Sequence, residues 1–244
     1  MKKFTKNVYL ISIVIIILVA AAVLILRTNI QKIAEINKLE DSLENLKAST
    51  KIQSYSSEKI PVLQSEDKIF GSPDAKVKIF VYEDYSNIYS ANLADILSKA
   101  NDEFNAGSNN NLAFIFRPYL RSPESLSAAI AVDCAGAQGK WLEMRNLLFD
   151  HAKNGQSVIA DLNSDSQKIG LDSDSFNSCL TNEQKSGKIE QLSSDPLEET
   201  IQGAPTMFIG SEMVLGARPY EEYVDSNGDK IEGLKQVIER QLKN

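Results

Sequence analysis

The chain has 244 residues, of which 43% are hydrophobic and 24% charged, and its formal net charge is −7. These values are typical of a globular protein, and the length suits one sizeable domain with additional segments. The acidic balance argues against nucleic acid as a partner and against adhesion to an anionic lipid face, because like charges repel.

An uncharged run of 19 residues, Val8–Leu26, stands near the N-terminus and follows three lysines. As a helix it would span about 28 Å, close to the hydrocarbon thickness of a bilayer. The lysines predict that residues 1–7 form a cytoplasmic tail and that the rest of the chain is exported. We therefore expect a single-pass transmembrane anchor in the cytoplasmic membrane of a bacterium, with an extracytoplasmic C-terminal domain.

The same run is also compatible with a cleaved signal peptide. Ala20–Ala22 supply small residues for cleavage, but four more apolar residues separate them from Arg27. The apolar region of a signal peptide is usually shorter and ends at its small residues. This comparison favours an uncleaved signal anchor.

Residues 27–50 are polar, and apolar residues recur within Ile36–Leu46 with a 3-4-3 spacing. The spacing predicts a juxtamembrane helical stalk with a short heptad seam. Two heptads are too few for a stable coiled coil, so we expect at most weak self-association through Ile36–Leu46. Residues 51–68 are rich in Ser, Lys and Glu and contain Pro61, which predicts a linker or a lead-in strand.

The compact domain is predicted over residues 69–244. Val77–Tyr82 is a nearly continuous apolar run, typical of a strand that is covered on both faces. Apolar residues then recur at helical spacing from Leu93 to Phe104, and Leu112–Phe116 predicts a second buried strand. This strand–helix–strand unit predicts a parallel pair of strands with a crossover helix.

A helical pattern broken by Gly and Asn follows at about residues 123–196. Its predicted helices are Ser125–Ala137, Trp141–Ala152 and Ser173–Leu180. Thr206–Ile209 and Glu212–Leu215 predict a hairpin, and Ile231–Leu242 predicts a final amphipathic helix. The order βαβ, helical insertion, ββα is that of an α/β thioredoxin-like fold.

Two motifs resemble the DsbA-like family of the thioredoxin superfamily. Tyr82–Ser90 reads Tyr-Glu-Asp-Tyr-Ser-Asn-Ile-Tyr-Ser, and Gly203–Thr206 reads Gly-Ala-Pro-Thr. The family carries Asp-Tyr-x-Cys-x-x-Cys after its first central strand and Gly-x-Pro-Thr before a later hairpin. The resemblance covers residues 71–242. Its further segments are Phe116–Leu120, Ala128–Cys134, Gln138–Gly139, Trp141, Leu148–Phe149 and Gly216–Tyr220.

The resemblance places Asn87 and Ser90 where the family has its two active-site cysteines. The family's protein disulfide oxidoreductase activity needs a thiolate at the helix N-terminus and a second thiol that resolves the mixed disulfide. An asparagine is no such nucleophile, and the serine alcohol stays protonated, although both side chains can cap a helix. A serine nucleophile would need a base, and we expect the one histidine, His151, at a helix C-terminus or on the surface. The sequence therefore predicts a degenerate active site with no catalytic residue.

The resemblance identifies Pro205 with the family's cis-proline. In the family, the backbone before this proline pairs with an extended substrate peptide, a form of strand addition that needs no thiol. The resemblance thus implies a peptide-binding site of Ala204, Pro205, Thr206 and Tyr89. A cis X-Pro bond is also a purely structural device in tight turns, and both interpretations remain open.

Cys134 and Cys179 are the only cysteines and stand 45 positions apart in the helical insertion. Their even number, the expected exported compartment and their place in segments that should pack together favour a structural disulfide. Some members of the family look to have an extra disulfide joining this region. Buried free thiols and a redox-active pair are the alternatives.

Metal and cofactor sites are weakly indicated. Asp225–Asp229 begins like a calcium loop, but Lys230 and Gln236 stand where an EF-hand needs Gly and Glu. We expect a turn there, with Asp229 near the start of the last helix, and no metal or other cofactor. The acidic residues 161–174 are expected to form a solvated face.

The leading functional prediction is a membrane-anchored peptide-binding or scaffolding module of the cell envelope that is redox-inactive at the usual site. The alternative is a thiol–disulfide oxidoreductase or isomerase of the DsbA family that works through Cys134 and Cys179.

Overall fold

The computed structural model describes residues 26–33, 36, 60–108, 110–182, 187–190, 193 and 201–243. The chain divides into two units, Met1–Lys51 and Ile52–Asn244. In the first unit residues 26–33 and 36 are helical and exposed. The predicted anchor up to Ile25 and the predicted seam beyond Ile36 lie outside the described residues. Within the described residues, every helix is too short or too polar to cross a membrane.

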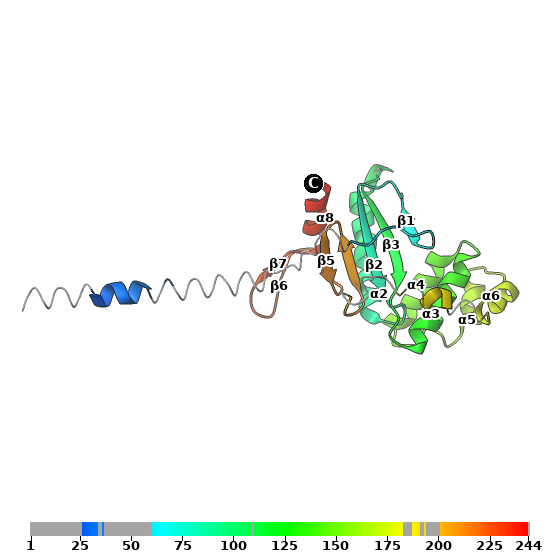
Figure 1. The fold of residues 1–244 in the computed structure, drawn as a ribbon. Coiled ribbons are helices and arrows are strands. Elements are labelled where there is room, and N and C mark those ends of the chain that lie inside the picture. Colours follow the sequence, from blue (N-terminus) through cyan, green and yellow to red (C-terminus); the bar gives the residue numbers. More distant parts are fainter. Residues whose placement is uncertain are drawn as a thin grey trace, which may run out of the picture. The chain divides into compact units, whose positions relative to one another are not determined.

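The centre of the second unit is a five-stranded sheet with the strand order β1-β3-β2-β4-β5 (Figure 1). Its strands are β1 (Lys68–Gly71), β2 (Val77–Glu83), β3 (Leu112–Pro118), β4 (Thr206–Ile209) and β5 (Glu212–Leu215). β2 and β3 pair in parallel, and the other neighbours are antiparallel. The predicted parallel pair and the predicted hairpin are therefore confirmed. β2 and β3 are buried along almost their whole length, as expected of strands covered on both faces.

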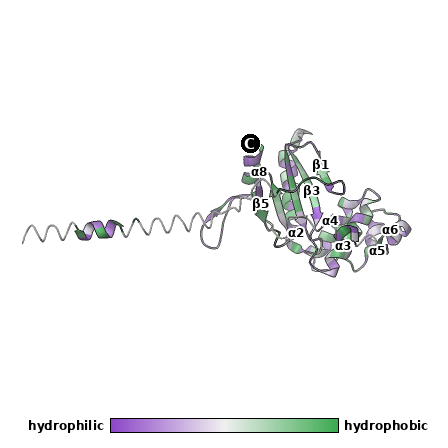
Figure 2. Cartoon of the chain, in the orientation of Figure 1, coloured by the Kyte–Doolittle hydropathy of each residue, from purple (hydrophilic) through white to green (hydrophobic). Residues whose placement is uncertain are grey.

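Two helices pack on one apolar cluster of this sheet. α2 (Ile88–Phe104) connects β2 to β3, and α8 (Leu234–Lys243) ends the described chain. Leu93 and Leu97 of α2 share a cluster with Val237 and Ile238 of α8. Figure 2 shows the hydrophobic residues gathered in the central strands. A short 3-10 turn, η2 (Ala106–Ser108), follows α2.

The predicted helical insertion has a core of its own. Its described helices are α3 (Pro123–Gly136), α4 (Trp141–Lys153), α5 (Leu162–Lys168) and α6 (Ser173–Leu180), and residues 187–190 and 193 are also helical. The core is built around Met144, Leu148, Phe149 and Phe176, which are all buried. The predicted helices Ser125–Ala137, Trp141–Ala152 and Ser173–Leu180 are confirmed as α3, α4 and α6.

The acidic stretch at residues 161–174 is solvated at Asp161, Asp172 and Asp174, as predicted. Asp165, which lies in α5, is the exception and is buried. The Asp165 carboxylate lies 3.0 Å from His151 Nε2 and 2.9 Å from Lys168 Nζ. These partners offset the cost of burying a carboxylate, so this acidic residue has a structural role.

The segment before α8 also differs from the prediction. β6 (Tyr223–Val224) and β7 (Lys230–Ile231) form a two-stranded sheet. Asp229 therefore precedes a strand, and the last helix begins at Leu234. The predicted turn is present, because Asp225 Oδ1 accepts hydrogen bonds at 2.9 Å from the backbone N–H groups of Asn227 and Asp229. Among the described residues, no group of three or more His, Cys, Asp or Glu side chains could hold a metal ion.

Part of the predicted linker belongs to the domain. The buried Arg117 guanidinium binds both oxygens of Asp67, with Nε–Oδ1 at 2.7 Å and Nη2–Oδ2 at 2.9 Å. It also donates to the Val62 carbonyl at 2.5 Å and to the Tyr82 hydroxyl at 3.0 Å. The linker boundary predicted at residue 68 is therefore too late, because an arginine inside β3 holds residues 62–67 on the domain.

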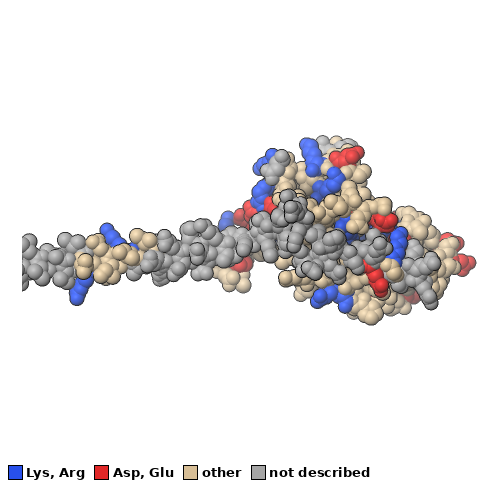
Figure 3. All heavy atoms as spheres, viewed as in Figure 1, with Lys and Arg blue, Asp and Glu red and all other residues tan. Residues whose placement is uncertain are grey.

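Charged side chains of both signs lie on the face drawn in Figure 3. Basic residues gather over α8, whose last turn carries Arg240 and Lys243. Acidic residues lie toward the outer end of the helical insertion. Basic and acidic residues are therefore partly separated on this face.

Candidate functional site

The predicted site lies at the sheet edge where β2 ends. β2 stops at Glu83, a turn follows, and α2 begins at Ile88. β4 runs antiparallel to β2, with Thr206 opposite Tyr82. The peptide bond between Ala204 and Pro205 is cis, as the resemblance implied. The register therefore brings the cis-proline loop and the start of α2 to the same edge of the sheet.

Asn87 caps α2. Its Oδ1 accepts hydrogen bonds from the backbone N–H groups of Tyr89 at 2.7 Å and Ser90 at 3.4 Å. The predicted capping role is thus confirmed for Asn87. Ser90 differs from the prediction: its buried Oγ accepts from the Asp84 backbone N–H at 3.2 Å and closes the turn before the helix. The first N–H groups of α2 are therefore engaged by an uncharged amide.

The cis-proline loop is held through its backbone. Thr206 Oγ1 donates to the Gly203 carbonyl at 2.7 Å, and the Pro205 carbonyl accepts from the Gly216 N–H at 2.8 Å. Pro205 and Thr206 are buried and Ala204 is half-buried. Within the described part of the chain, no residue forms a hydrogen bond with the backbone N–H or carbonyl of Ala204.

Two apolar side chains at the start of α2 are exposed to solvent. Ile88 is 46% exposed and Tyr89 is 63% exposed. Among the four predicted peptide-binding residues, Tyr89 is thus the one with a freely accessible side chain. Ala204, Pro205 and Thr206 can contribute mainly backbone groups and shape.

A buried ion pair ties the turn before α2 to the helical insertion. Arg145 Nε lies 2.6 Å from Glu83 Oε1, and Nη2 lies 2.7 Å from Oε2. The guanidinium also lies over the rings of Phe116 and Phe149, at 4.3 and 4.7 Å from their centroids. Burial raises the pKa of the Glu83 carboxyl, and Arg145 acts in the opposite direction.

The sequence analysis missed this pair. Two sequence features could have indicated it. Arg145 lies on the apolar face of α4, next to Met144 and within one turn of Leu148 and Phe149. Glu83 ends a strand that is otherwise largely apolar. Each of the two features is common alone, and the fold brings them together.

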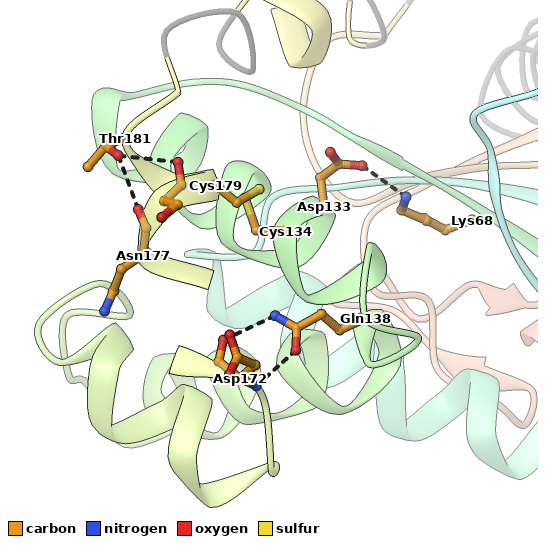
Figure 4. Close-up of a disulfide and its surroundings, with 9 residues drawn as sticks. Lys68, Asp133, Cys134, Gln138, Asp172, Asn177, Cys179 and Thr181 are labelled. Carbon is orange, nitrogen blue, oxygen red and sulfur yellow. Dashed lines mark hydrogen bonds and ion pairs between the residues drawn. A yellow bond between two sulfur atoms is a disulfide. The ribbon is translucent and has the colours of Figure 1, made fainter. Parts of the chain in front are cut away.

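Cys134 and Cys179 form a disulfide that joins α3 to α6 (Figure 4). The prediction of a disulfide is confirmed, and the alternative of buried free thiols is wrong. Cys134 is buried and Cys179 is partly exposed. Both cysteines of the chain are therefore paired with each other.

His151 stands in the last turn of α4, as predicted. Its Nε2 contacts Asp165, and its Nδ1 lies 3.1 Å from Gln156 Oε1. Both ring nitrogens thus have partners within the insertion. The Ser90 hydroxyl oxygen, in turn, accepts a hydrogen bond from the Asp84 N–H at 3.2 Å.

The central sheet, the crossover helix α2 and the cis-proline loop define a thioredoxin-like domain. The family described as Thioredoxin matches residues 64–226. The chain belongs to this family, with a helical insertion between β3 and β4.

Solved structures of several thioredoxin-like and DsbA proteins share the fold of this domain. A thioredoxin-like oxidoreductase from Silicibacter pomeroyi DSS-3 has a TM-score of 0.58 and 18% identity, covering 74% of this chain and 95% of its own. Wolbachia pipientis alpha-DsbA1 has a TM-score of 0.57 and 19% identity, covering 77% and 96%. Oxidised BdbD from Bacillus subtilis has a TM-score of 0.58 and 18% identity, covering 73% and 94%. At these identities the likeness establishes the fold alone.

A curated relative is the Na(+)/H(+) antiporter NhaA 1 of Salinispora arenicola (strain CNS-205). It is 26% identical over 161 residues, which are 65% of this chain. The chain spans 24% of the length of that protein. The similarity is therefore to one segment of a longer protein.

Proposed function

We propose that the protein is a membrane-anchored, extracytoplasmic thioredoxin-fold module that binds extended polypeptide segments beside Pro205 and performs no dithiol chemistry at the start of α2. Val8–Leu26 is the single-pass anchor in the cytoplasmic membrane of a bacterium. The observation that carries the proposal is the identity of the residue that caps α2, which is Asn87. Asn87 stands there with its amide oxygen on two backbone N–H groups, at the point where the DsbA-like family needs a thiolate.

Peptide binding rests on the groups that remain open at this edge. Ala204 offers a backbone donor and acceptor with no partner among the described residues. An extended peptide that pairs with these groups adds a short strand, and its side chains can lie on Ile88 and Tyr89. None of these contacts requires a thiol.

Weak self-association through Ile36–Leu46 is a further part of the proposal. Ile36 is helical and exposed, and Leu26, Ile30 and Ile33 are also exposed apolar residues of this unit. An exposed apolar stripe of this kind favours pairing with a second copy of the helix.

Tyr89→Ala is expected to weaken binding of an unfolded protein by about fivefold or more, because exposed aromatic residues often dominate peptide contacts. The probe is reduced, carboxymethylated α-lactalbumin. Its affinity for the full-length protein in non-ionic detergent is measured by isothermal titration calorimetry.

Val224→Ala is the matched control, because Val224 is also apolar, is 61% exposed and lies on β6. The control should keep wild-type affinity. Equal affinity of the wild type and Tyr89→Ala, or no binding of the probe by the wild type, would remove the peptide-binding proposal.

Asn87→Cys is expected to yield a thiol with a pKa well below its ordinary value of about 8.5, because Asn87 Oδ1 already accepts from two helix N–H groups. Adding Ser90→Cys supplies a second thiol one turn on, and the double variant should catalyse insulin reduction by dithiothreitol. The measurements are thiolate absorbance against pH and insulin turbidity.

The wild type should be inactive in the insulin assay. Wild-type activity equal to that of the double variant would contradict the absence of dithiol chemistry. An ordinary thiol pKa in Asn87→Cys would show that the turn is not arranged like a redox site.

The alternative function, an oxidoreductase or isomerase working through Cys134 and Cys179, has one observation in its favour. Cys179 is partly exposed at the end of α6, so a thiol from another molecule can approach it. The stability of this disulfide against reduction separates the two functions.

A further inference from the structure

A groove separates α2 of the thioredoxin core from α4 of the helical insertion. It consists of two adjoining hollows of 180 and 250 Å³, and Ala94, Ser98 and Asn146 line both of them. Small side chains on α2 leave this space open between two helices that pack against each other. Ligand sites occur preferentially at such junctions between two separately packed parts of a protein.

The first hollow has both polar and apolar lining residues, and aromatic rings form its floor. Phe70, Phe114 and Phe116 line the first hollow together with Leu97 and Leu142. The ring centroids of Phe70 and Phe114, and those of Phe114 and Phe116, are 6.4 Å apart in each pair. Phe114 and Phe116 are buried and Phe70 is 37% exposed, so an incoming aliphatic or aromatic side chain would contact Phe70.

The walls of the groove carry uncompensated negative charge. Lys153 Nζ binds Asp95 at 2.7 and 2.8 Å, and Arg145 is paired with Glu83. Asp102 lines the first hollow and Asp150 lines the second. In the part of the chain that the structure describes, neither of these two carboxylates has a cationic partner within ion-pair distance.

We propose that this groove docks a basic segment of a partner polypeptide, in which a lysine or arginine stands next to a leucine or phenylalanine. The apolar side chain lies beside Phe70 in the first hollow, and cations of the segment lie near Asp102 in the first hollow and near Asp150 in the second. An acidic partner does not fit, because it would place like charges together in a partly desolvated groove. The groove uses other residues than the edge at Pro205, so the two sites are independent.

The test compares two acetylated peptides of nine residues by isothermal titration calorimetry with the full-length protein in non-ionic detergent. The first has the sequence Gly-Lys-Leu-Phe-Lys-Leu-Arg-Gly-Gly, and the second has Glu in place of each Lys and Arg. The first should bind at low salt and the second should not. Asp102→Asn with Asp150→Asn should weaken binding by about fivefold, the size expected for two exposed charge pairs.

Two further variants make the result specific to the groove. Ser98→Tyr fills both hollows and should weaken binding by more than the charge variant does. Asp174→Asn, an exposed carboxylate on α6, makes one similar charge change elsewhere and should leave the affinity unchanged.

Three outcomes would overturn the proposal: no binding of the basic peptide, binding that Asp102→Asn with Asp150→Asn leaves unchanged, or equal weakening by Asp174→Asn. Tyr89→Ala should not affect this peptide, which separates the groove from the site at Pro205. Loss of binding in Tyr89→Ala would therefore assign the basic peptide to the other site and would also overturn the proposal.

Discussion

Arg145→Met is expected to lower the free energy of unfolding by about 3–5 kcal/mol, because it leaves the Glu83 carboxylate buried without a cation. Glu83 is fully buried, and Arg145 binds both of its oxygens. Methionine keeps much of the length of the arginine, so the lost charge dominates over the lost volume. Urea unfolding of the variant and the wild type measures the difference.

The same variant should show a characteristic pH dependence. Without Arg145, burial alone acts on the Glu83 pKa, which then lies further above the ordinary glutamate value of about 4.3. When the pKa of a carboxyl is raised in the folded state, the free energy of unfolding of the protein falls as the pH rises through that pKa. The difference in free energy of unfolding between the wild type and Arg145→Met should therefore be largest at high pH. It should become smaller as the pH falls from 7 toward 4.

Glu83→Leu combined with Arg145→Met is the control for this mechanism. It removes both charges and leaves no buried polar group without a partner, and replacing a buried ion pair by hydrophobic residues of similar volume is often close to neutral. The double variant should recover most of the lost stability and lose the pH dependence. A double variant as unstable as Arg145→Met would show that packing of the arginine over Phe116 and Phe149, and not the stranded charge, causes the loss.

Removal of the disulfide by Cys134→Ala with Cys179→Ala is expected to lower the free energy of unfolding by about 4 kcal/mol. The bond closes a loop between residues with a sequence separation of 45, and a loop of this length restricts the unfolded chain by about that amount. Urea unfolding is again the measurement. Wild-type protein reduced with dithiothreitol is the control, because it loses the bond without a change of side chains.

A redox titration of the same bond tests its role. Alkylation and mass spectrometry across thiol redox buffers should place its reduction potential below about −300 mV, as is typical of structural disulfides. The burial of Cys134 in the core of the insertion supports this expectation. A potential between about −270 and −120 mV, the range of thioredoxin-family catalysts, would instead support the oxidoreductase alternative.

Much of the fold could be predicted from local patterns. The apolar runs of β2 and β3 and the helical spacing in α3, α4 and α6 are signals within single segments, and the structure confirms them. β1 was missed because only four residues form it, and they follow a polar segment that reads as a linker. α5 was missed because its buried residues are polar. Asp165 is buried in contact with His151 of α4, and no local pattern predicts that contact.

Less of the candidate site than of the fold could be predicted from local sequence patterns. Asn87 as a helix cap follows from residue type and position. The common location of Asn87 and Pro205 at one edge of the sheet came from the resemblance, because no local pattern relates such distant residues. The ion pair of Glu83 and Arg145 and the clamp of Arg117 on Asp67 were out of reach for the same reason.

If Val8–Leu26 anchors the chain as proposed above, the clamp of Arg117 on Asp67 and Val62 shortens the tether between that anchor and the domain. It removes residues 62–68 from a connection that the sequence alone would count as free, and an extended chain spans at most about 3.3–3.6 Å per residue. The maximum reach of the head from the bilayer is thereby reduced by about 24 Å. A shorter tether confines the head to a smaller volume, which raises its effective concentration toward any partner held in the same membrane. In the proposed anchored protein, a buried arginine in a central strand would thus limit the distance between the domain and the membrane.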